Sequence, residues 1–192
     1  MSLDTIFHRH IAEHQQAVKA LSDATEAAIM HAAERLSQCF HDGGKAIFLG
    51  NGGSAAEAQH LAAEFLGRLQ QERSPLPALA LHANGSTLTA IANDYGYEQV
   101  FARQLSALAR PGDVVIGIST SGNSPNIIAA LRCARSLICA TIAMTGQNGG
   151  NLSEFADVLI PVPSHSTLRI QECHILLGHI LCDLVEKKIY GS

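Results

Sequence analysis

Two helix-spaced pairs of side chains offer the chemistry of a metal or acid–base site. His60 and Glu64 lie four residues apart, so on a helix they project from one face. Gln171 and His179 also share a helical face, two turns apart, whereas His174 points elsewhere. Together the two pairs offer two imidazoles, a carboxylate and an amide oxygen, which suit zinc or a similar divalent ion. By spacing alone, each pair can instead be a surface pair or a core histidine with a polar neighbour.

A glycine-rich turn directly precedes the first of these helices. Ala46–Leu49 is a short apolar run typical of a buried parallel strand, and Gly50-Asn51-Gly52-Gly53 follows it. Glycines allow positive φ and let backbone N–H groups approach an anion at the start of the next helix. Ser54 is the expected N-cap of that helix. The order of strand, glycine turn and helix therefore predicts an anion-binding loop joined to the metal-type helix.

A second candidate anion loop follows the clearest strand, Val114–Ile118. Its sequence is Ser119-Thr120-Ser121-Gly122-Asn123-Ser124, and Pro125 comes next at the expected first turn of a helix. Hydroxyl and N–H donors at the carboxyl end of a strand suit a phosphate group. The alternative is a serine-rich turn with an N-cap, but the position after a buried strand favours phosphate binding.

The composition is that of a compact chain without strong charge. Of the 192 residues, 47% are hydrophobic and 16% are charged, which suits one well-buried α/β domain. The formal net charge is −4 and no basic run occurs, so we expect neither a nucleic-acid nor a membrane partner. Charged residues within Met1–Ala20 argue against a signal peptide or spanning segment, so we expect a cytoplasmic protein.

The cysteine pattern predicts thiols packed in a core. Five cysteines are scattered along the chain without a CxxC spacing, an arrangement that fits neither a disulfide framework nor a thiolate zinc site. They are Cys39, Cys133, Cys139, Cys173 and Cys182.

Periodicity and glycine or proline breaks give the expected order of elements. Two helices lie within Asp4–His41, interrupted near Ser22-Asp23, and we expect this arm to pack against another subunit. Strands are expected at 46–49, 76–81, 114–118, 139–144 and 158–160. Helices are expected from Ser54 and at 87–92, 98–108, 126–136, 151–155 and 166–187, with a turn at 93–96. This order predicts an α/β fold, a parallel sheet with helices on both faces and ligand at the carboxyl ends of its strands.

Two further patterns complete the reading. Asp94, in the expected turn, is either an Asx cap or a functional residue. The glycines match neither a P-loop nor a GxGxxG fingerprint, so we expect no nucleotide cofactor.

Five ordered segments resemble one known family. They are Gly50-Asn51-Gly52-Gly53-Ser54-Ala55, the pair His60/Glu64, Ala92-Asn93-Asp94-Tyr95-Gly96, Gly117-Ile118-Ser119-Thr120-Ser121-Gly122-Asn123-Ser124, and Arg169-Ile170-Gln171-Glu172 with His174 and His179. Together they resemble the phosphoheptose isomerases (sedoheptulose 7-phosphate isomerases), a sugar-isomerase (SIS) domain family of bacterial lipopolysaccharide heptose synthesis. The resemblance covers nearly the whole chain, as far as Lys187.

The resemblance implies a fold, an assembly and a reaction. The fold is a three-layer αβα sandwich with a flavodoxin-like parallel sheet. One SIS domain spans residues 1–192, with a helical arm at 1–43 and an α/β core at 44–192, and four copies form a homotetramer. The implied reaction converts sedoheptulose 7-phosphate to D-glycero-D-manno-heptose 7-phosphate by zinc-assisted enediol isomerisation, with one Zn²⁺ per subunit, as the first step of ADP-heptose synthesis.

The resemblance also implies roles for particular residues. Glu64 would be the base, His179 its acid–base partner and Asp94 a proton relay. The zinc ligands would be His60, Glu64, Gln171 and His179. The phosphate would lie among Ser119, Thr120, Ser121 and Ser124. The remaining substrate contacts would come from Asn51, Gly52, Gly53, Ser54, Glu64, Asn93, Asp94 and Gln171.

One segment differs from the family pattern. His82-Ala83-Asn84-Gly85-Ser86 lacks the acidic or hydroxyl residues expected directly after the second strand.

Other functions with the same fold are open. The main alternative is a non-catalytic relative that binds the replication initiator DnaA, and that relative is expected to lack the equivalents of Glu64 and His179. A sugar-phosphate-sensing SIS regulator would normally carry a DNA-binding domain, for which this chain offers no length.

Overall fold

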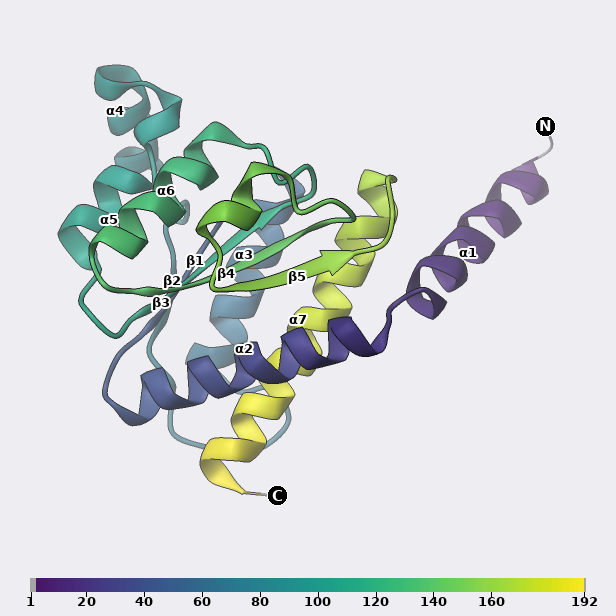
Figure 1. Cartoon of the computed structure of the whole chain (residues 1–192), viewed down its shortest axis with the longest axis horizontal. Coiled ribbons are helices and arrows are strands. Elements are labelled where there is room, and N and C mark those ends of the chain that lie inside the picture. The colour runs from purple at the N-terminus through teal and green to yellow at the C-terminus, as the bar shows by residue number, and fades with distance from the viewer. Residues whose placement is uncertain (1–2, 192) are drawn as a thin grey trace.

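The computed structural model describes residues 3–191, which form two N-terminal helices followed by alternating strands and helices (Figure 1). Residues 1, 2 and 192 of the expected 1–192 domain lie outside the described residues. In chain order the elements are α1 (Leu3–Lys19), α2 (Asp23–His41), β1 (Ala46–Gly50), α3 (Gly53–Leu66), β2 (Ala78–Ala80), α4 (Gly85–Tyr95), η1 (Tyr97–Gln99), α5 (Ala102–Leu108), β3 (Val114–Ser119), α6 (Pro125–Ser136), β4 (Ala140–Gly146), η2 (Gly150–Phe155), β5 (Val158–Val162) and α7 (Thr167–Tyr190).

The strands form one parallel sheet in the order β2-β1-β3-β4-β5. Every residue of β1 and β3 is buried, as expected for apolar strands covered on both faces. The helices α2, α3 and α7 pack on one face, and α5 and α6 pack on the other (Figure 1). The expected three-layer α/β sandwich with a flavodoxin-like sheet is therefore confirmed.

The strand order places the two candidate anion loops side by side. From β1 the chain crosses to β2 on one side, whereas from β3 it proceeds to β4 and β5 on the other. Such a reversal opens a crevice at the carboxyl ends of the two central strands. Gly50, the last residue of β1, pairs with Ile118, so Asn51 follows β1 beside Ser119, the last residue of β3.

Two local expectations are wrong. The N-cap of α3 is Gly52, and Ser54 is buried within the first turn. Gly52 has a φ of 56°, which glycine adopts readily, so the helix can begin before the serine. The segment 93–96 is not a separate turn, because α4 continues to Tyr95 and the N–H of Gly96 still bonds to the carbonyl of Ala92.

The remaining expectations differ mainly in their boundaries. The helix expected at 98–108 divides into η1 and α5, and the strand expected at 76–81 is reduced to β2. All five cysteines are free thiols, and four of them are buried, which confirms the prediction of thiols in the core. Within the described residues, no helix is both long and apolar enough to cross a membrane.

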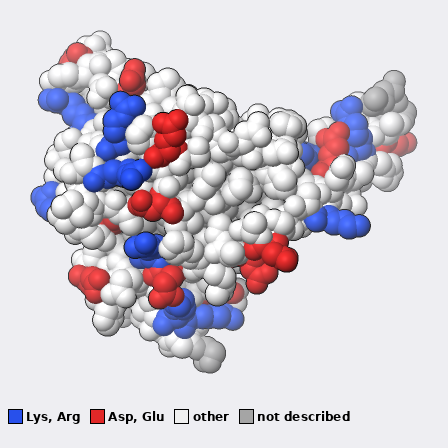
Figure 2. Space-filling model, in the orientation of Figure 1, with Lys and Arg blue, Asp and Glu red and all other residues white. Residues whose placement is uncertain are grey.

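Two helices extend from the packed layers, and only part of each packs against the core. In Figure 1, α1 projects from one side of the molecule and α4 from the other. On α1 only Ala17 is buried, and Leu3 and Phe7 are 84% and 63% exposed. On α4 no residue is buried. Figure 2 shows charges of both signs interspersed over the α5 and α6 side and along α1.

A buried ion pair fixes the loop that follows α3. Nε of Arg73 lies 2.6 Å from Oε2 of Glu186 on α7, with side chains only 2% and 1% exposed. The guanidinium also donates to the carbonyls of Glu64 and Phe65, which are in the last turn of α3. Glu186 accepts N–H groups from residues 69–71. A cation therefore satisfies carbonyls at the C-terminus of α3, directly beside Glu64.

Replacement of Glu186 by Gln should destabilise the fold. Arg73 would keep its charge in a buried position without a carboxylate, so we expect the free energy of unfolding at pH 7 to fall by about 3–5 kcal/mol. Urea denaturation followed by circular dichroism measures this change. Lys187→Gln, at an exposed position next in the helix, is the matched control and should change stability by less than about 0.5 kcal/mol. An equal effect of the two variants would contradict the role of the pair.

The effect of Glu186→Gln should depend on pH. Burial raises the pKa of the Glu186 carboxyl, but hydrogen bonds from Arg73 and from the N–H groups of Gln71, Leu69 and Gln70 outweigh it, so the pKa lies below its ordinary value of 4.5. A lowered folded-state pKa gives stability that is present above pH 4.5 and lost as pH falls through the lowered value. The stability difference between wild type and variant should therefore narrow in acid. A constant difference from pH 7 to pH 3 would contradict this account.

Candidate active site

Three predicted residues meet where α3 and α7 pack together. Nε2 of His60 lies 2.8 Å from Nε2 of His179 and 3.3 Å from Oε1 of Glu64. One ligand atom from each side chain lies within 4.8 Å of the others. The side chain of His60 is 48% exposed and that of Glu64 is 19% exposed, so the group is open to a small ligand. We call the contact between the facing sides of α3 and α7 the α3–α7 seam.

Two glycines allow the helices of the seam to approach. A Cβ atom at Gly178 would lie 2.6 Å from Cδ2 of Leu61 on α3. A Cβ atom at Gly53 would lie 2.3 Å from Nε2 of Gln171 on α7. Any larger residue at these positions would push the helices or side chains apart. Since Gly178 immediately precedes His179, the close approach brings that imidazole to His60.

The donor set and its spacing fit a divalent cation. A tetrahedral zinc ion with ligand bonds of about 2.0–2.1 Å sets its ligand atoms roughly 3.3 Å apart. The separation of 3.3 Å between His60 and Glu64 agrees with this value, and the two imidazoles, at 2.8 Å, would separate slightly. The nearby thiol of Cys182 is no competing ligand in its neutral form, because burial raises its pKa and the charge of Glu64 raises it further.

Gln171 lies in the same seam but away from the three-residue group. Its amide packs against Gly53, at the opposite end of α3 from Glu64. This position is at the helix N-terminus, where N–H groups point outward, and an amide there can bind a sugar hydroxyl. Its role as a fourth metal ligand stays a prediction.

The glycine turn brings Asn51 into a polar network that the sequence did not reveal. Asn51 and Asn126 exchange amide hydrogen bonds of 2.8 and 2.9 Å. The hydroxyl of Tyr97 also donates to Oδ1 of Asn51, at 3.1 Å. Sequence reasoning missed Asn126 and Tyr97, because their partner lies many residues away in the chain. The sequence offered one signal for each: Asn126 closely follows the serine loop, and Tyr97 directly follows the segment that contains Asp94.

The serine loop has the shape of an anion site. Oγ of Ser119 and Oγ of Ser124 lie 3.0 Å apart, so two of the predicted phosphate contacts converge. Ser121 accepts the N–H of Asn123 through its Oγ atom. Gly122 has a φ of 66° and leaves no room for a Cβ atom, which would lie 2.1 Å from the carbonyl oxygen of Gly149. The loop therefore presents its hydroxyls at the N-terminus of α6 in a tightly constrained form.

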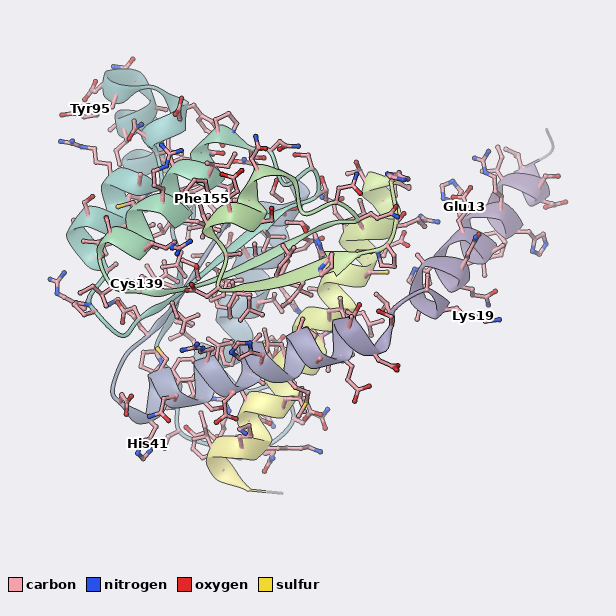
Figure 3. The ribbon with its side chains drawn as sticks, viewed as in Figure 1. Glu13, Lys19, His41, Tyr95, Cys139 and Phe155 are labelled. Atoms are coloured by element: carbon pink, nitrogen blue, oxygen red, sulfur yellow. The ribbon has the colours of Figure 1, made fainter. Side chains whose placement is uncertain are left out.

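Asn93 and Asp94 are placed apart from the metal-type group. Nδ2 of Asn93 donates to Oδ1 of Asp94 at 2.8 Å, and both residues are exposed on α4. In Figure 3 the next residue, Tyr95, lies at the outer end of α4, across the molecule from α1. Among the described residues, no hydrogen bond joins Asp94 to His60, Glu64 or His179.

The loop after β2, residues 82–86, which differs from the family pattern, begins with a histidine whose ring makes no hydrogen bond among the described residues. Neither ring nitrogen of His82 is exposed, and neither has a hydrogen-bond partner among the described residues. Burial lowers its pKa, and a backbone interaction with Ala55 only partly offsets this effect. The His82 ring therefore lies beside the first turn of α3, in surroundings that favour its neutral form.

Comparison with known proteins shows which family the chain belongs to. The family model of the SIS domain matches residues 9–146. A phosphoheptose isomerase of Roseiflexus sp. (strain RS-1) is 54% identical over 174 residues, which cover 90% of this chain and 88% of that protein. Another from Aquifex aeolicus (strain VF5) is 54% identical over 161 residues, 84% of each chain.

Solved structures give the same result. A phosphoheptose isomerase from Francisella tularensis superposes with a TM-score of 0.94 at 37% identity, covering 97% of this chain and all of that one. The enzyme from Neisseria gonorrhoeae gives a TM-score of 0.88 at 45% identity over 97% of this chain. The fold and site thus define a SIS-domain enzyme, an aldose–ketose isomerase that acts on a sugar phosphate. Within that class, the chain belongs to the phosphoheptose isomerase family.

The three-residue group should bind a divalent ion independently of any reaction. We expect chelator competition to show one zinc ion bound per chain, and His60→Gln or His179→Gln to weaken zinc affinity by more than about 100-fold, because loss of a mere outer-shell partner already costs 10–100-fold. His41→Gln, at an exposed position at the end of α2, is the matched control (Figure 3). Zinc affinity that is equal in all four proteins would contradict the assignment.

The serine loop should bind inorganic phosphate. Ser124→Ala removes a hydroxyl that makes no helix-capping bond, so the loss should appear in ligand affinity rather than in folding. A hydrogen bond to a charged group contributes about 1.5–3 kcal/mol, which corresponds to a loss of roughly 10- to 150-fold. Isothermal titration calorimetry measures it. Ser106→Ala, on α5, is the control and should bind phosphate as wild type does.

Proposed function

We propose that the protein converts sedoheptulose 7-phosphate to D-glycero-D-manno-heptose 7-phosphate with the help of zinc. The observation that supports this most directly is the His60, Glu64 and His179 group, in the chain that also carries the constrained serine loop. A seven-carbon sugar phosphate needs both parts, an anion site for its phosphate and acid–base groups for its first two carbons. The relatives named phosphoheptose isomerase support the choice of sugar.

The proposed chemistry moves a carbonyl from C2 to C1. Glu64 removes a proton from C1, beside the ketone, and an enediol forms as O2 is protonated. The proton then returns to C2 and O1 loses its proton, so no redox cofactor is consumed. His179 donates and accepts protons at the two oxygens. A zinc ion held by His60, Glu64 and His179 would supply Lewis-acid polarisation of the substrate oxygens.

Glu64 is proposed both as a metal ligand and as the base. A carboxylate has two oxygens, so one can face a cation while the other faces the substrate. Its position is held from behind, because Arg73 binds the Glu64 carbonyl at 2.8 Å. The base is therefore attached to a rigid helix end, as proton transfer at a fixed distance requires.

The other substrate contacts follow the two loops. Ser119, Thr120, Ser121 and Ser124 are proposed to bind the phosphate. The proposed sugar contacts are Asn51, Gly52, Gly53, Ser54, Gln171, Asn93 and Asp94. For Asp94 to act as a proton relay, α4 has to approach the α3–α7 seam, from this chain or a neighbouring one.

We further propose that the protein is a homotetramer in the cytoplasm. The exposed apolar side chains of α1, including Leu3, Phe7 and Ile11, support burial of the arm against other copies. The product would enter ADP-heptose synthesis for the lipopolysaccharide core. These statements rest on the family resemblance together with that exposed arm.

Turnover of sedoheptulose 7-phosphate, with zinc content measured on the same sample, tests the proposal. We expect wild type to turn over only with zinc bound, and Glu64→Gln to lower kcat by about 10²- to 10⁴-fold, the usual contribution of a general base. His41→Gln should retain wild-type kcat. Zinc-loaded, folded wild type without turnover would refute the proposal and favour the initiator-binding alternative.

A further inference from the structure

A buried pair of titratable side chains in the α3–α7 seam has no part in the proposed mechanism. His174, on α7, is fully buried, and the side chain of Glu57, on α3, is only 11% exposed. Nδ1 of His174 lies 3.8 Å from Oε2 of Glu57. Each of these two atoms is buried, and neither has a hydrogen-bond partner among the described residues. The two atoms thus face each other with nothing else to satisfy them.

The surroundings of His174 leave two buried acceptor atoms facing each other. Nε2 of the ring lies 3.1 Å from the carbonyl oxygen of Thr145. A carbonyl only accepts hydrogen bonds, so Nε2 carries a hydrogen atom. A neutral ring would then direct the lone pair of Nδ1 at a carboxylate oxygen, and two buried acceptors would face each other at a considerable cost. A proton between Glu57 and His174 would remove this conflict, once a small side-chain shift shortens the 3.8 Å separation to hydrogen-bond distance.

The pair connects the two halves of the site. Thr145 is next to the end of β4 and pairs in register with Ser119 of the serine loop. The following residue, Gly146, donates its N–H to the carbonyl of Thr120 at 3.0 Å. Glu57 lies on α3 one turn after Gly53 and one turn before His60. The pair therefore lies between the helix that carries the metal-type group and the end of β4, which pairs with the start of the serine loop.

We propose that Glu57 and His174 are positioning residues, a proton-sharing pair that sets the spacing between the metal-type group and the serine loop. The inference rests on the proposed function, because a sugar phosphate must reach from one half of the site to the other. Binding of phosphate alone, or of zinc alone, needs only one half. Turnover needs both at a fixed separation, and a misplacement of about 1 Å can cost roughly 100-fold in rate.

The test compares variants that differ in whether a proton can lie between the two residues. We expect Glu57→Ala and His174→Asn to lower kcat about 10- to 100-fold, while affinities for inorganic phosphate and zinc stay within about twofold of wild type. Glu57→Gln should keep kcat within about threefold, because its amide can donate a hydrogen bond to Nδ1 of a neutral ring. Gln59→Ala, at an exposed position on α3, is the matched control.

The double variant adds a further check. If the two residues act as a pair, Glu57→Ala combined with His174→Asn should turn over no more slowly than the slower single variant. Circular dichroism and gel filtration establish that each variant folds and assembles as wild type does. If Glu57→Ala does not fold, His174→Asn and Glu57→Gln provide the comparison.

Several results would overturn the inference. The first is a wild-type kcat in both Glu57→Ala and His174→Asn. The second is a loss of phosphate or zinc affinity in proportion to the loss of kcat. The third is an equal loss of kcat in Glu57→Gln and Glu57→Ala. Wild-type protein that binds phosphate and zinc without turnover would refute the proposed function, and the positioning role with it. Active wild type with unimpaired variants would refute the positioning role alone.

Discussion

The close packing of α3 on α7 is the constraint on which the site depends. Two glycines, Gly53 and Gly178, leave room for side chains of the facing helix, because a Cβ atom there would meet the amide of Gln171 or the side chain of Leu61. At that distance the imidazoles of His60 and His179 meet. Neither helix alone has more than part of a divalent-ion site. The metal-type group is therefore a property of the helix contact, and small residues are as necessary to it as the ligands themselves.

The parallel sheet determines where the two candidate anion loops lie. Because the strand order reverses between β1 and β3, the glycine turn and the serine loop leave the sheet side by side. The hydrogen bonds between Asn51 and Asn126 connect the glycine turn to the first turn of α6, directly after the serine loop. In the proposed reaction, the substrate has a phosphate at one end and the reacting carbons at the other, so it would have to reach from the serine loop to the seam. The contacts at Thr145 and Gly146 join these parts through the protein interior.

Arginine contacts fix the two ends of α7. Arg169, at the start of α7, donates to the carbonyl of His10 at 2.6 Å and so fixes the middle of α1, whose N-terminal part stays exposed. At the other end of α7, Glu186 and Arg73 fix the loop after α3. The helix α7 is thus held at both ends by arginine contacts, which keep His179 and Gln171 at set positions along it. In contrast, α4 has no buried residue. The surroundings of Asp94 therefore depend on what packs against the exposed side of that helix.

Much of this protein follows from the sequence by itself. Apolar runs followed by glycine or serine turns, such as Ala46–Leu49 and Val114–Ile118, indicated buried parallel strands with anion loops, since backbone geometry and local periodicity decide such features. The four-residue spacing of His60 and Glu64 likewise determined one shared helical face. Local signals were less reliable where glycine permits several starts or stops, so Ser54 was misassigned as an N-cap and 93–96 as a turn.

Only the tertiary structure decided which of these residues meet. Contacts between distant segments depend on helix packing and strand order, which no local pattern encodes. His60 and His179 are brought together in this way, as are Asn51, Asn126 and Tyr97. The same packing placed Gln171 against Gly53 and left Asp94 exposed on α4. It also buried Glu57 opposite His174, a pairing visible only once both helices lie against the sheet, because burial removes the water that would otherwise satisfy each group.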